Sequence, residues 1–216
     1  MQLKQAQENM LKQQLRTFGI TDNTVLALFE EIPRELFVPE NLQTFAYADV
    51  AIPIGHGQVM MPPKETAFML QALGIKNIEN VLIVGVESGY ITALTAKLAK
   101  QVQVLDLSAE LINQAKEKLS SLQINNVTFA VGDGVETAKQ EGEYQIIIIT
   151  GSLPHLPKIF RKNLARHGRI FAIIGNPPVM EASVLKRTAQ GLQAEKLFEI
   201  NHPRLPNTRE PKTFVF

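Results

Sequence analysis

The sequence predicts an α/β fold, a mostly parallel sheet with helices on both faces. Short apolar runs that suit buried strands alternate with segments of helical spacing between residues 64 and 174. The run Val-Leu-Ile-Val at 81–84 is joined by a glycine-bearing turn at 85–89 to a helical segment at 91–99. This order of strand, glycine turn and helix is typical of βαβ units that bind nucleotides.

Composition narrows the class of protein. The chain has 216 residues, 45% of them hydrophobic, and 22 basic against 21 acidic side chains, so no charge excess favours nucleic acid or an anionic membrane. Cysteine is absent, which excludes disulfides, thiolate catalysis and cysteine-ligated zinc, and the few histidines lack the spacing of metal ligands. We expect a cytoplasmic protein without a membrane segment, because the polar N-terminus has no apolar signal region.

The chain is expected to form one domain over residues 1–216. Its N-terminal part, 1–63, is predicted to hold an amphipathic helix over 3–18, ended by Gly19, and a second helix capped by Thr21 or Asp22 and running to residue 31. A loop-rich segment rich in glycine and proline follows at 41–63, and loops this long are usually functional.

A cofactor-binding core is expected over 64–175 and C-terminal strands over 176–216. The expected helices lie at 64–73, 91–99, 111–122 and 156–164, and the expected strands at 81–84, 101–107, 127–131, 144–150 and 168–174. Residues 182–198 and 213–216 are predicted to form antiparallel edge strands.

The turn at 85–89 has the properties of a cofactor loop. Such a turn aims backbone N–H groups and a helix N-terminus at a bound polar group, with glycine where the ligand lies against the backbone. Gly85 and Gly89 supply two of these positions. Glu87 stands between them, where loops for dinucleotides or S-adenosylmethionine usually have glycine, and it brings a side chain and a negative charge to the cofactor's place.

Two further acids fit a nucleotide site. Asp106 ends the next predicted strand about 20 residues after the glycine turn, where an acid hydrogen-bonds ribose hydroxyls in this fold. The Gly132-Asp133-Gly134 sequence ends a third strand and can present a carboxylate to an adenine amino group. Asp133 can equally be a plain turn residue, since Asp and Gly dominate turns.

With these elements in place, the chain resembles the protein-L-isoaspartate (D-aspartate) O-methyltransferase family. Ile-Pro-Arg-Glu-Leu-Phe-Val at 32–38 is similar to a family block before the fold core, and residues 47–58 resemble the segment leading to its substrate loop. Residues 81–90, Asp106, 132–134 and the loop at 150–157 then follow in the family's order.

The resemblance implies a Rossmann-like, seven-stranded methyltransferase fold that binds S-adenosylmethionine and methylates the α-carboxylate of isoaspartyl residues in damaged proteins. It implies cofactor-binding roles for Gly85, Val86, Glu87, Ser88, Gly89, Asp106, Leu107, Gly132, Asp133, Gly134 and Thr150. Substrate-binding roles are implied for Ile54, Gly55, His56, Gln58, Val59, Met60 and Met61. Asp49 and the position of Met61 are the candidate catalytic sites, no metal is expected, and the chain is expected to be a monomer or homodimer.

Departures from the family pattern leave alternatives open. The family continues after the loop glycine and glutamine with Thr-x-Ser-x-Pro, and this chain has Val59-Met60-Met61-Pro62-Pro63, so both substrate-binding hydroxyls are absent. The family's acids at two other positions are Ile83 and Gln145 here. Glu87 either turns to solvent or pairs with a charge of the cofactor. The chain is then a working repair methyltransferase, a pseudoenzyme that acts through protein interactions, or a methyltransferase for a less polar acceptor with Val59, Met60 and Met61 as pocket walls.

Overall fold

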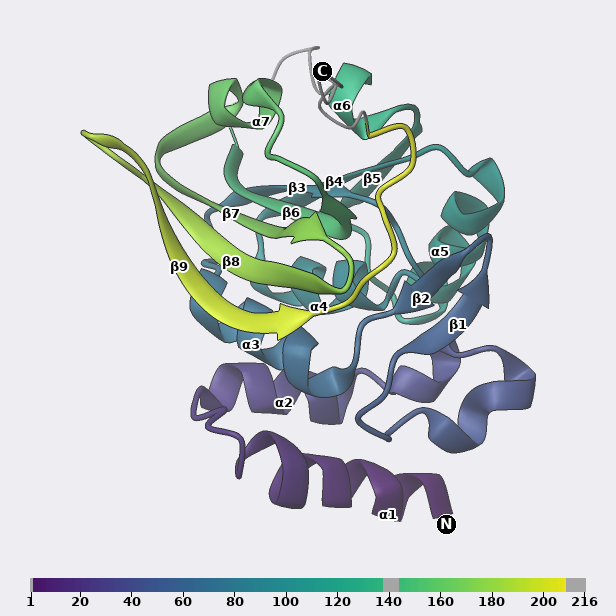
Figure 1. Cartoon of the computed structure of the whole chain (residues 1–216). Helices are drawn as coiled ribbons and strands as arrows, with labels where there is room; N and C mark the ends of the chain where they lie inside the picture. The colour runs from purple at the N-terminus through teal and green to yellow at the C-terminus, as the bar shows by residue number, and fades with distance from the viewer. Residues whose placement is uncertain (1, 138–143, 209–216) are drawn as a thin grey trace.

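A seven-stranded sheet forms the centre of the protein, in the order β5-β4-β3-β6-β7-β8-β9 (Figure 1). The computed structural model describes residues 2–137 and 144–208. The strands are β3 Asn80–Val84, β4 Gln101–Asp106, β5 Val127–Val131, β6 Tyr144–Leu153, β7 Leu164–Asn176, β8 Val179–Thr188 and β9 Gly191–Ile200. Pairing is parallel from β5 through β7 and antiparallel for β8 and β9. The predicted α/β class with a mostly parallel sheet is confirmed.

Both faces of the central strands β3 and β6 are buried, which explains the unbroken apolar runs. Along β3, Val81 and Ile83 belong to one core cluster, whereas Leu82 and Val84 belong to a second cluster on the opposite face. Figure 1 shows the N-terminal helices on one side of the sheet and the short helices α6 Gly134–Thr137 and α7 Lys158–Lys162 on the other. Helices on both faces are what a parallel sheet requires.

The helices on the first face follow the predicted pattern. They are α1 Gln2–Asn9, the π-helical η1 Met10–Leu15, α2 Asn23–Glu31, the 3-10 segments η2 Arg34–Phe37 and η3 Glu40–Phe45, α3 Pro63–Leu73, α4 Tyr90–Leu98 and α5 Ala109–Ser121. Asp22 is the N-cap of α2, since its carboxylate accepts from the backbone N–H groups of Thr24 and Val25. The helix predicted over 3–18 exists but ends at Leu15, and it changes from α to π geometry at Met10.

The loop-rich segment contains a hairpin that the sequence did not reveal. Strands β1 Ile52–Gly55 and β2 Gln58–Met60 pair antiparallel. His56 and Gly57 both have positive φ, +52° and +69°, as a two-residue type I′ turn requires. Glycine and proline in so short a segment hide the alternation of apolar and polar residues by which strands are recognised.

Two boundaries near the C-terminus differ from prediction. The helix expected over 156–164 is the shorter α7, because Leu164 already belongs to β7, where it pairs with Tyr144 and packs in the second core cluster. The strands expected over 182–198 form the β8–β9 hairpin. The strand predicted at 213–216 lies outside the described residues.

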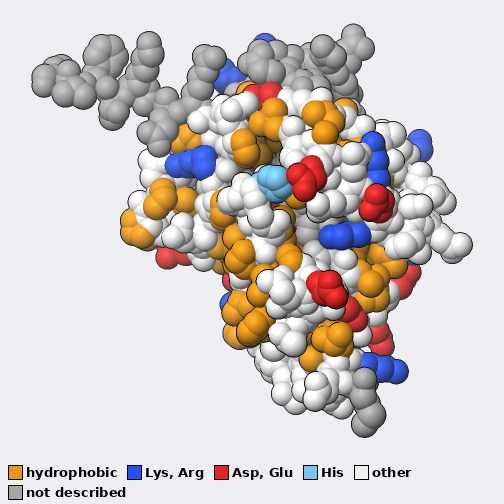
Figure 2. All heavy atoms as spheres, turned by 90° about the vertical axis from the view of Figure 1, so that its right-hand side faces the viewer, with side chains coloured by type: hydrophobic (Ala, Val, Ile, Leu, Met, Phe, Trp, Pro, Cys, Tyr) orange, Lys and Arg blue, Asp and Glu red, His pale blue; other side chains and the backbone are white. Residues whose placement is uncertain are grey.

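Charged side chains of both signs are interspersed with apolar ones on the face that carries β1, β2 and α5 (Figure 2). Within the described residues, no helix is long and apolar enough to span a bilayer. The same ranges hold no cluster of three or more acidic or histidine side chains arranged to bind a metal ion.

Candidate active site

The predicted cofactor turn joins β3 to α4 at the carboxyl end of the parallel strands. Gly85 and Gly89 have φ of +93° and +89°, a region that side chains disfavour. A Cβ on Gly85 would lie 2.1 Å from Oγ1 of Thr150, whose hydroxyl donates to the backbone carbonyls of Val84 and Gly85. Only glycine therefore fits at position 85, and Thr150 from β6 fixes the start of the turn.

Asp106 lies beside this turn, as predicted. Its Oδ2 accepts from the backbone N–H of Val86 at 2.7 Å, and its Oδ1 accepts from the N–H of Ser108, also at 2.7 Å. The side chain is buried, with an exposed fraction of 6%. Asp106 thus ties the ends of β3 and β4 together through backbone groups.

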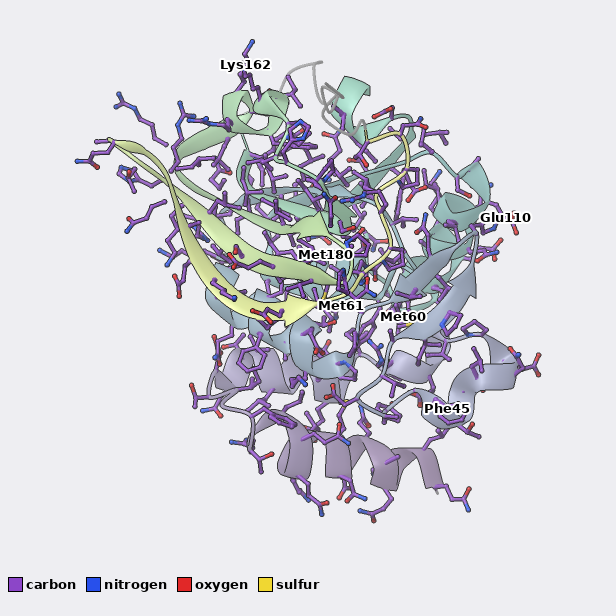
Figure 3. All side chains as sticks on the ribbon, in the orientation of Figure 1. Phe45, Met60, Met61, Glu110, Lys162 and Met180 are labelled. Atoms are coloured by element: carbon purple, nitrogen blue, oxygen red, sulfur yellow. The ribbon has the colours of Figure 1, made fainter. Side chains whose placement is uncertain are left out.

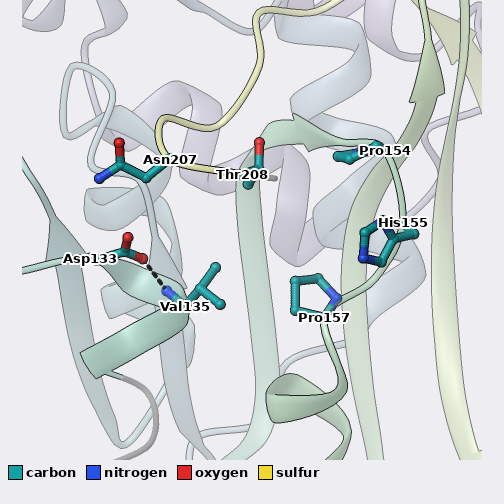
Figure 4. Close-up of a pocket in the computed structure, with 7 residues that line it drawn as sticks. All are labelled: Asp133, Val135, Pro154, His155, Pro157, Asn207 and Thr208. Carbon is teal, nitrogen blue, oxygen red and sulfur yellow. Dashed lines mark hydrogen bonds between the residues drawn. The ribbon is translucent and has the colours of Figure 1, made fainter. Parts of the chain in front are cut away.

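The third predicted element, 132–134, follows β5 at the same edge. The N–H of Gly132 donates to the carbonyl of Asp106, and a Cβ on Gly134 would lie 2.1 Å from Val84. Asp133 accepts from the N–H of Val135 (Figure 4). A pocket of about 500 Å³ opens there, and it is lined by Asp133, Val135, Pro154, His155, Pro157, Asn207 and Thr208.

Glu87 points into the protein, so of the two alternatives left open by the sequence, the one in which it turns to solvent is wrong. Its exposed fraction is 4%, and its backbone φ is +49°. Oε1 lies 3.7 Å from Nε2 of His202. Burial raises the pKa of Glu87 to about 8, although the Arg34 charge and a backbone hydrogen bond from Met61 favour the ionised form. Glu87 is therefore mostly protonated and neutral at pH 7.

Arg34 is the cation whose charge acts on Glu87, and the sequence predicts no role for it. It is fully buried, and its Nη2 donates to the carbonyl of Met61 at 2.8 Å. Its Nε and Nη1, Oε1 of Glu87 and the hydroxyl of Tyr90 have no hydrogen-bond partner within the described ranges. Burial lowers the pKa of Arg34, against the opposing effect of Tyr90 and Glu87. A cluster of unsatisfied polar groups thus lies behind the cofactor turn.

His202 is the second side chain that sequence reasoning missed. It is buried, and burial lowers its pKa to about 4, against a hydrogen bond with the backbone of Thr150. It is therefore neutral at pH 7, like Glu87 beside it. No local pattern marks His202, since only the return of the chain across the sheet brings it to the turn.

The implied substrate residues fall into two groups. Gln58 and Val59 line a small cavity together with Gly85, Glu87 and Thr150. In contrast, Met60 and Met61 are each 1% exposed and lie in the same core cluster as Met180 (Figure 3). The structure thus makes Met60 and Met61 core residues and not the walls of an apolar acceptor pocket.

The remaining hairpin residues lie away from that cavity. His56 is exposed at the tip of the hairpin with Nε2 3.4 Å from Oε2 of Glu110, and Gly55 has a positive φ of +87°. Ile54 is partly buried and packs against the main core. His56 therefore extends toward α5.

Asp49 and Gln145 have structural partners. Asp49 forms an ion pair with Lys64 at 3.0 Å and accepts from its backbone N–H. Gln145 accepts from the N–H of Asn80 at the start of β3. The other implied cofactor residues, Val86 and Ser88, are buried in the turn, where Ser88 Oγ accepts from the N–H of Tyr90, and Leu107 is exposed.

The residue types around the turn fit S-adenosylmethionine, whereas the space does not. The cavity between Val59, Glu87 and His202 and the cavity beside Asp106 each have a volume of about 20 Å³. A ligand of this size needs roughly 300 Å³ or more, and 20 Å³ is little more than the room for one water. Glu87 and Leu205, which contacts Gly85 and Gly151, fill the place.

Comparison with known proteins identifies the family. The family model described as protein-L-isoaspartate(D-aspartate) O-methyltransferase matches residues 5–201. A protein-L-isoaspartate O-methyltransferase of Idiomarina loihiensis is 34% identical over 197 residues, covering 91% of this chain and 92% of the relative. One of Methanoculleus marisnigri is 36% identical over 172 residues, covering 80% and 78%.

The fold agrees with this assignment. A Plasmodium falciparum structure of the same designation, in complex with S-adenosyl-L-homocysteine, superposes with a TM-score of 0.79 at 23% identity and covers 95% of this chain and 98% of that one. On the sequence matches and the shared fold, the chain belongs to the protein-L-isoaspartate(D-aspartate) O-methyltransferase family.

Proposed function

We propose that this protein transfers the methyl group of S-adenosylmethionine to the α-carboxylate of isoaspartyl residues in damaged proteins. The observation that carries the proposal is the meeting of the glycine turn, Asp106 and Asp133 at one sheet edge in a chain of this family. The relatives from Idiomarina loihiensis and Methanoculleus marisnigri carry the designation protein-L-isoaspartate O-methyltransferase, which supports the proposal.

The chemistry suits a site without an evident base. The cofactor supplies a methyl group on a sulfonium, and the acceptor carboxylate is already ionised near pH 7, so positioning does more than proton transfer. His56 is exposed, and His202 and Glu87 are both neutral at pH 7 and buried. None of them is needed to deprotonate the acceptor.

The proposed holding residues come from three strand ends. Asp106 would hold the ribose, Asp133 the adenine amino group, and the backbone of the turn at Gly85 the methionine part of the cofactor. Gln58 and Val59 would meet the acceptor peptide, and this role is supported by their lining the cavity next to the turn.

Binding of the acceptor carboxylate is expected to be weaker than the family pattern implies, because two hydroxyl side chains are absent. Val59 and Met61 occupy positions where the family has hydroxyl side chains, and Met61 is buried in the core. Each lost hydrogen bond to a carboxylate costs on the order of 1.5–3 kcal/mol, or roughly tenfold to a hundredfold in affinity. We therefore propose slow or weak-binding turnover of isoaspartyl peptides.

The test is methyl transfer to an isoaspartyl peptide, with the same peptide containing normal aspartate as the matched control. The proposal expects incorporation into the isoaspartyl peptide only, and loss of most of that rate in Asp106→Asn. Lys186→Ala, on an exposed ion pair of the β8–β9 hairpin, is the control variant. Cofactor binding without transfer to either peptide would point to another acceptor, and a folded protein without binding or transfer would leave the interaction-protein alternative.

A further inference from the structure

The chain after β9 crosses the carboxyl edge of the sheet and packs on the end of β6. This part, residues 202–208, is here called the C-terminal segment, and Figure 1 shows it in yellow rising from the end of β9 past β2 toward α6. The N–H of Ser152 donates to Pro203, and the N–H of Leu205 donates back to Ser152, both at 2.9 Å. Ser152 and Arg204 thereby form a parallel bridge. The C-terminal segment is therefore attached to the edge of β6 by a single parallel β-bridge.

Side chains reinforce this attachment at both ends. The Ser152 hydroxyl donates to the carbonyl of His202 at 2.9 Å. Arg204 donates from Nη1 to the carbonyl of Gly175 and from Nη2 to Oδ1 of Asn176. These contacts hold the segment on β6 and on the end of β7.

Leu205 brings apolar surface to the same place. It is 7% exposed and belongs to the core cluster of Val84, Leu105 and Ile149 at the carboxyl end of the strands. A Cβ added to Gly151 would lie 2.7 Å from the Cα of Leu205, so the glycine permits the close approach. Leu205 therefore lies over the turn that begins at Gly85.

The C-terminal segment also divides the space at this edge. Residues 202–206 line the cavity beside Glu87, Leu205 and Pro206 line the cavity beside Asp106, and Asn207 and Thr208 line the larger pocket beside Asp133. Figure 4 shows the last two residues across the pocket from His155 and Pro157. The C-terminal segment thus lines all three cavities, which follow the ends of β3, β4, β5 and β6 and are together called the cleft.

We propose that the C-terminal segment and an S-adenosyl cofactor compete for this cleft. The proposal rests on the proposed function, and it adds that the chain has a closed state in which Leu205 and Pro206 take the place between Gly85 and Asp106. Cofactor binds after the segment lifts from β6, and its apparent affinity is reduced by the fraction of molecules that are closed.

The first test is a reversible lock. The chain has no cysteine, so Ser152→Cys with Arg204→Cys would introduce the only two thiols. Bridge partners have Cα atoms about 5 Å apart, within the range for a disulfide. Calorimetric titration with S-adenosylhomocysteine is expected to show binding to the reduced protein and at least a hundredfold weaker binding to the oxidised protein.

The second test loosens the segment without touching the cofactor turn. Arg204→Ala removes two hydrogen bonds and is expected to tighten S-adenosylhomocysteine binding about fivefold to tenfold. Lys186→Ala, whose side chain pairs with Glu195 on the distant hairpin, is expected to leave the affinity unchanged.

The outcomes separate this proposal from the proposed function. Equal binding by the oxidised and reduced double variants, with Arg204→Ala like wild type, would overturn the competition and leave the methyltransferase assignment standing. No binding by wild type, reduced double variant or Arg204→Ala at millimolar ligand would overturn both, because a loosened segment would then not expose a cofactor site.

Discussion

Two clusters of an arginine and a glutamate lie at opposite ends of the parallel strands. The first consists of Arg169 and Glu79, and the second of Arg34 and Glu87. Arg169 donates to both oxygens of Glu79, at 3.1 and 2.9 Å, and to the carbonyls of Leu73 and Gly74 at the end of α3. Arg34 donates one hydrogen bond, to Met61, and its Nε and Nη1 have no partner in the described parts of the chain. The first cluster is fully hydrogen-bonded, and the second is not.

The difference in hydrogen bonding between the two clusters corresponds to their different positions in the fold. Glu79 lies just before β3, and Arg169 pairs with Ile146 near the start of β6, so both lie toward the amino ends of these parallel strands. Arg34 and Glu87 lie at the opposite edge, behind the cofactor turn. Buried polar groups in native proteins are normally satisfied, and exceptions concentrate where a ligand binds or a segment moves.

The largest expected change in unfolding free energy is for the hydrogen-bonded pair of Arg169 and Glu79. Arg169→Met removes the cation and two hydrogen bonds from the Glu79 carboxylate, which keeps only the backbone N–H of Lys76 as a donor in the described parts of the chain, and it removes the Arg169 donors to two helix-end carbonyls. We therefore expect a loss of about 3–5 kcal/mol of unfolding free energy. Arg34→Met removes one hydrogen bond and a cation–π contact with Tyr90, but it also removes two buried nitrogens that have no partner in the described parts of the chain, so a loss of about 1 kcal/mol or less is expected. Urea denaturation of both variants checks this, and equal losses would contradict the contrast between the clusters.

Stability should also depend on pH through Glu87. Its pKa is raised from 4.5 to about 8 in the folded protein, so the folded state holds a proton that the unfolded state releases, and stability falls as pH rises between those values. The pKa of His202 is lowered from 6.5 to about 4, which has the opposite effect between about pH 4 and 6.5. From pH 6.5 to 8 only Glu87 of these two residues changes the stability, and the unfolding free energy is expected to fall by about 2 kcal/mol over this range.

The variant Glu87→Gln isolates this effect, since it keeps the side-chain volume and cannot ionise. We expect its unfolding free energy, measured in urea, to lose the fall between pH 6.5 and 8 that wild type shows. A fall of the same size in both proteins would assign the pH dependence to other groups.

A smaller effect is expected on ligand affinity. Glu87→Gly vacates space beside Gly85 and relieves a positive φ of +49°, so S-adenosylhomocysteine binding should tighten about tenfold. Glu87→Gln is the matched control, with the space still filled and no gain expected. Weaker binding by the glycine variant would mean that the glutamate contacts the ligand favourably.

The smallest effect is expected at the surface. Lys186 and Glu195 form an ion pair with side chains about half exposed on the β8–β9 hairpin. Lys186→Ala should change the unfolding free energy by less than about 0.5 kcal/mol, because solvent screens such pairs. A larger loss by urea denaturation would show that the hairpin pair matters more than its exposure suggests.

Much of the cofactor half of the site was predictable because its signals are local. Gly85, Gly89 and Asp106 sit at fixed distances along the chain from strands that apolar runs reveal, and the structure places them together at one edge. The β1–β2 hairpin was missed, since three or four residues with glycine and proline carry no clear period. The burial of Met60 and Met61 was equally invisible, because either a pocket wall or a core position suits methionine.

The sequence by itself determined the α/β class, the order of strand, turn and helix, and the family, since these depend on periodicity and on residues close together in the chain. Only the tertiary structure decided that Glu87 turns inward to Arg34 and His202, and that Leu205 lies over Gly85. These contacts join residues separated by about 50 to 120 positions, and those of His202 and Leu205 exist because the chain after β9 returns across the sheet. Local propensity does not encode such a return, because the free energy that favours it comes from burying Leu205 against strands formed elsewhere in the sequence.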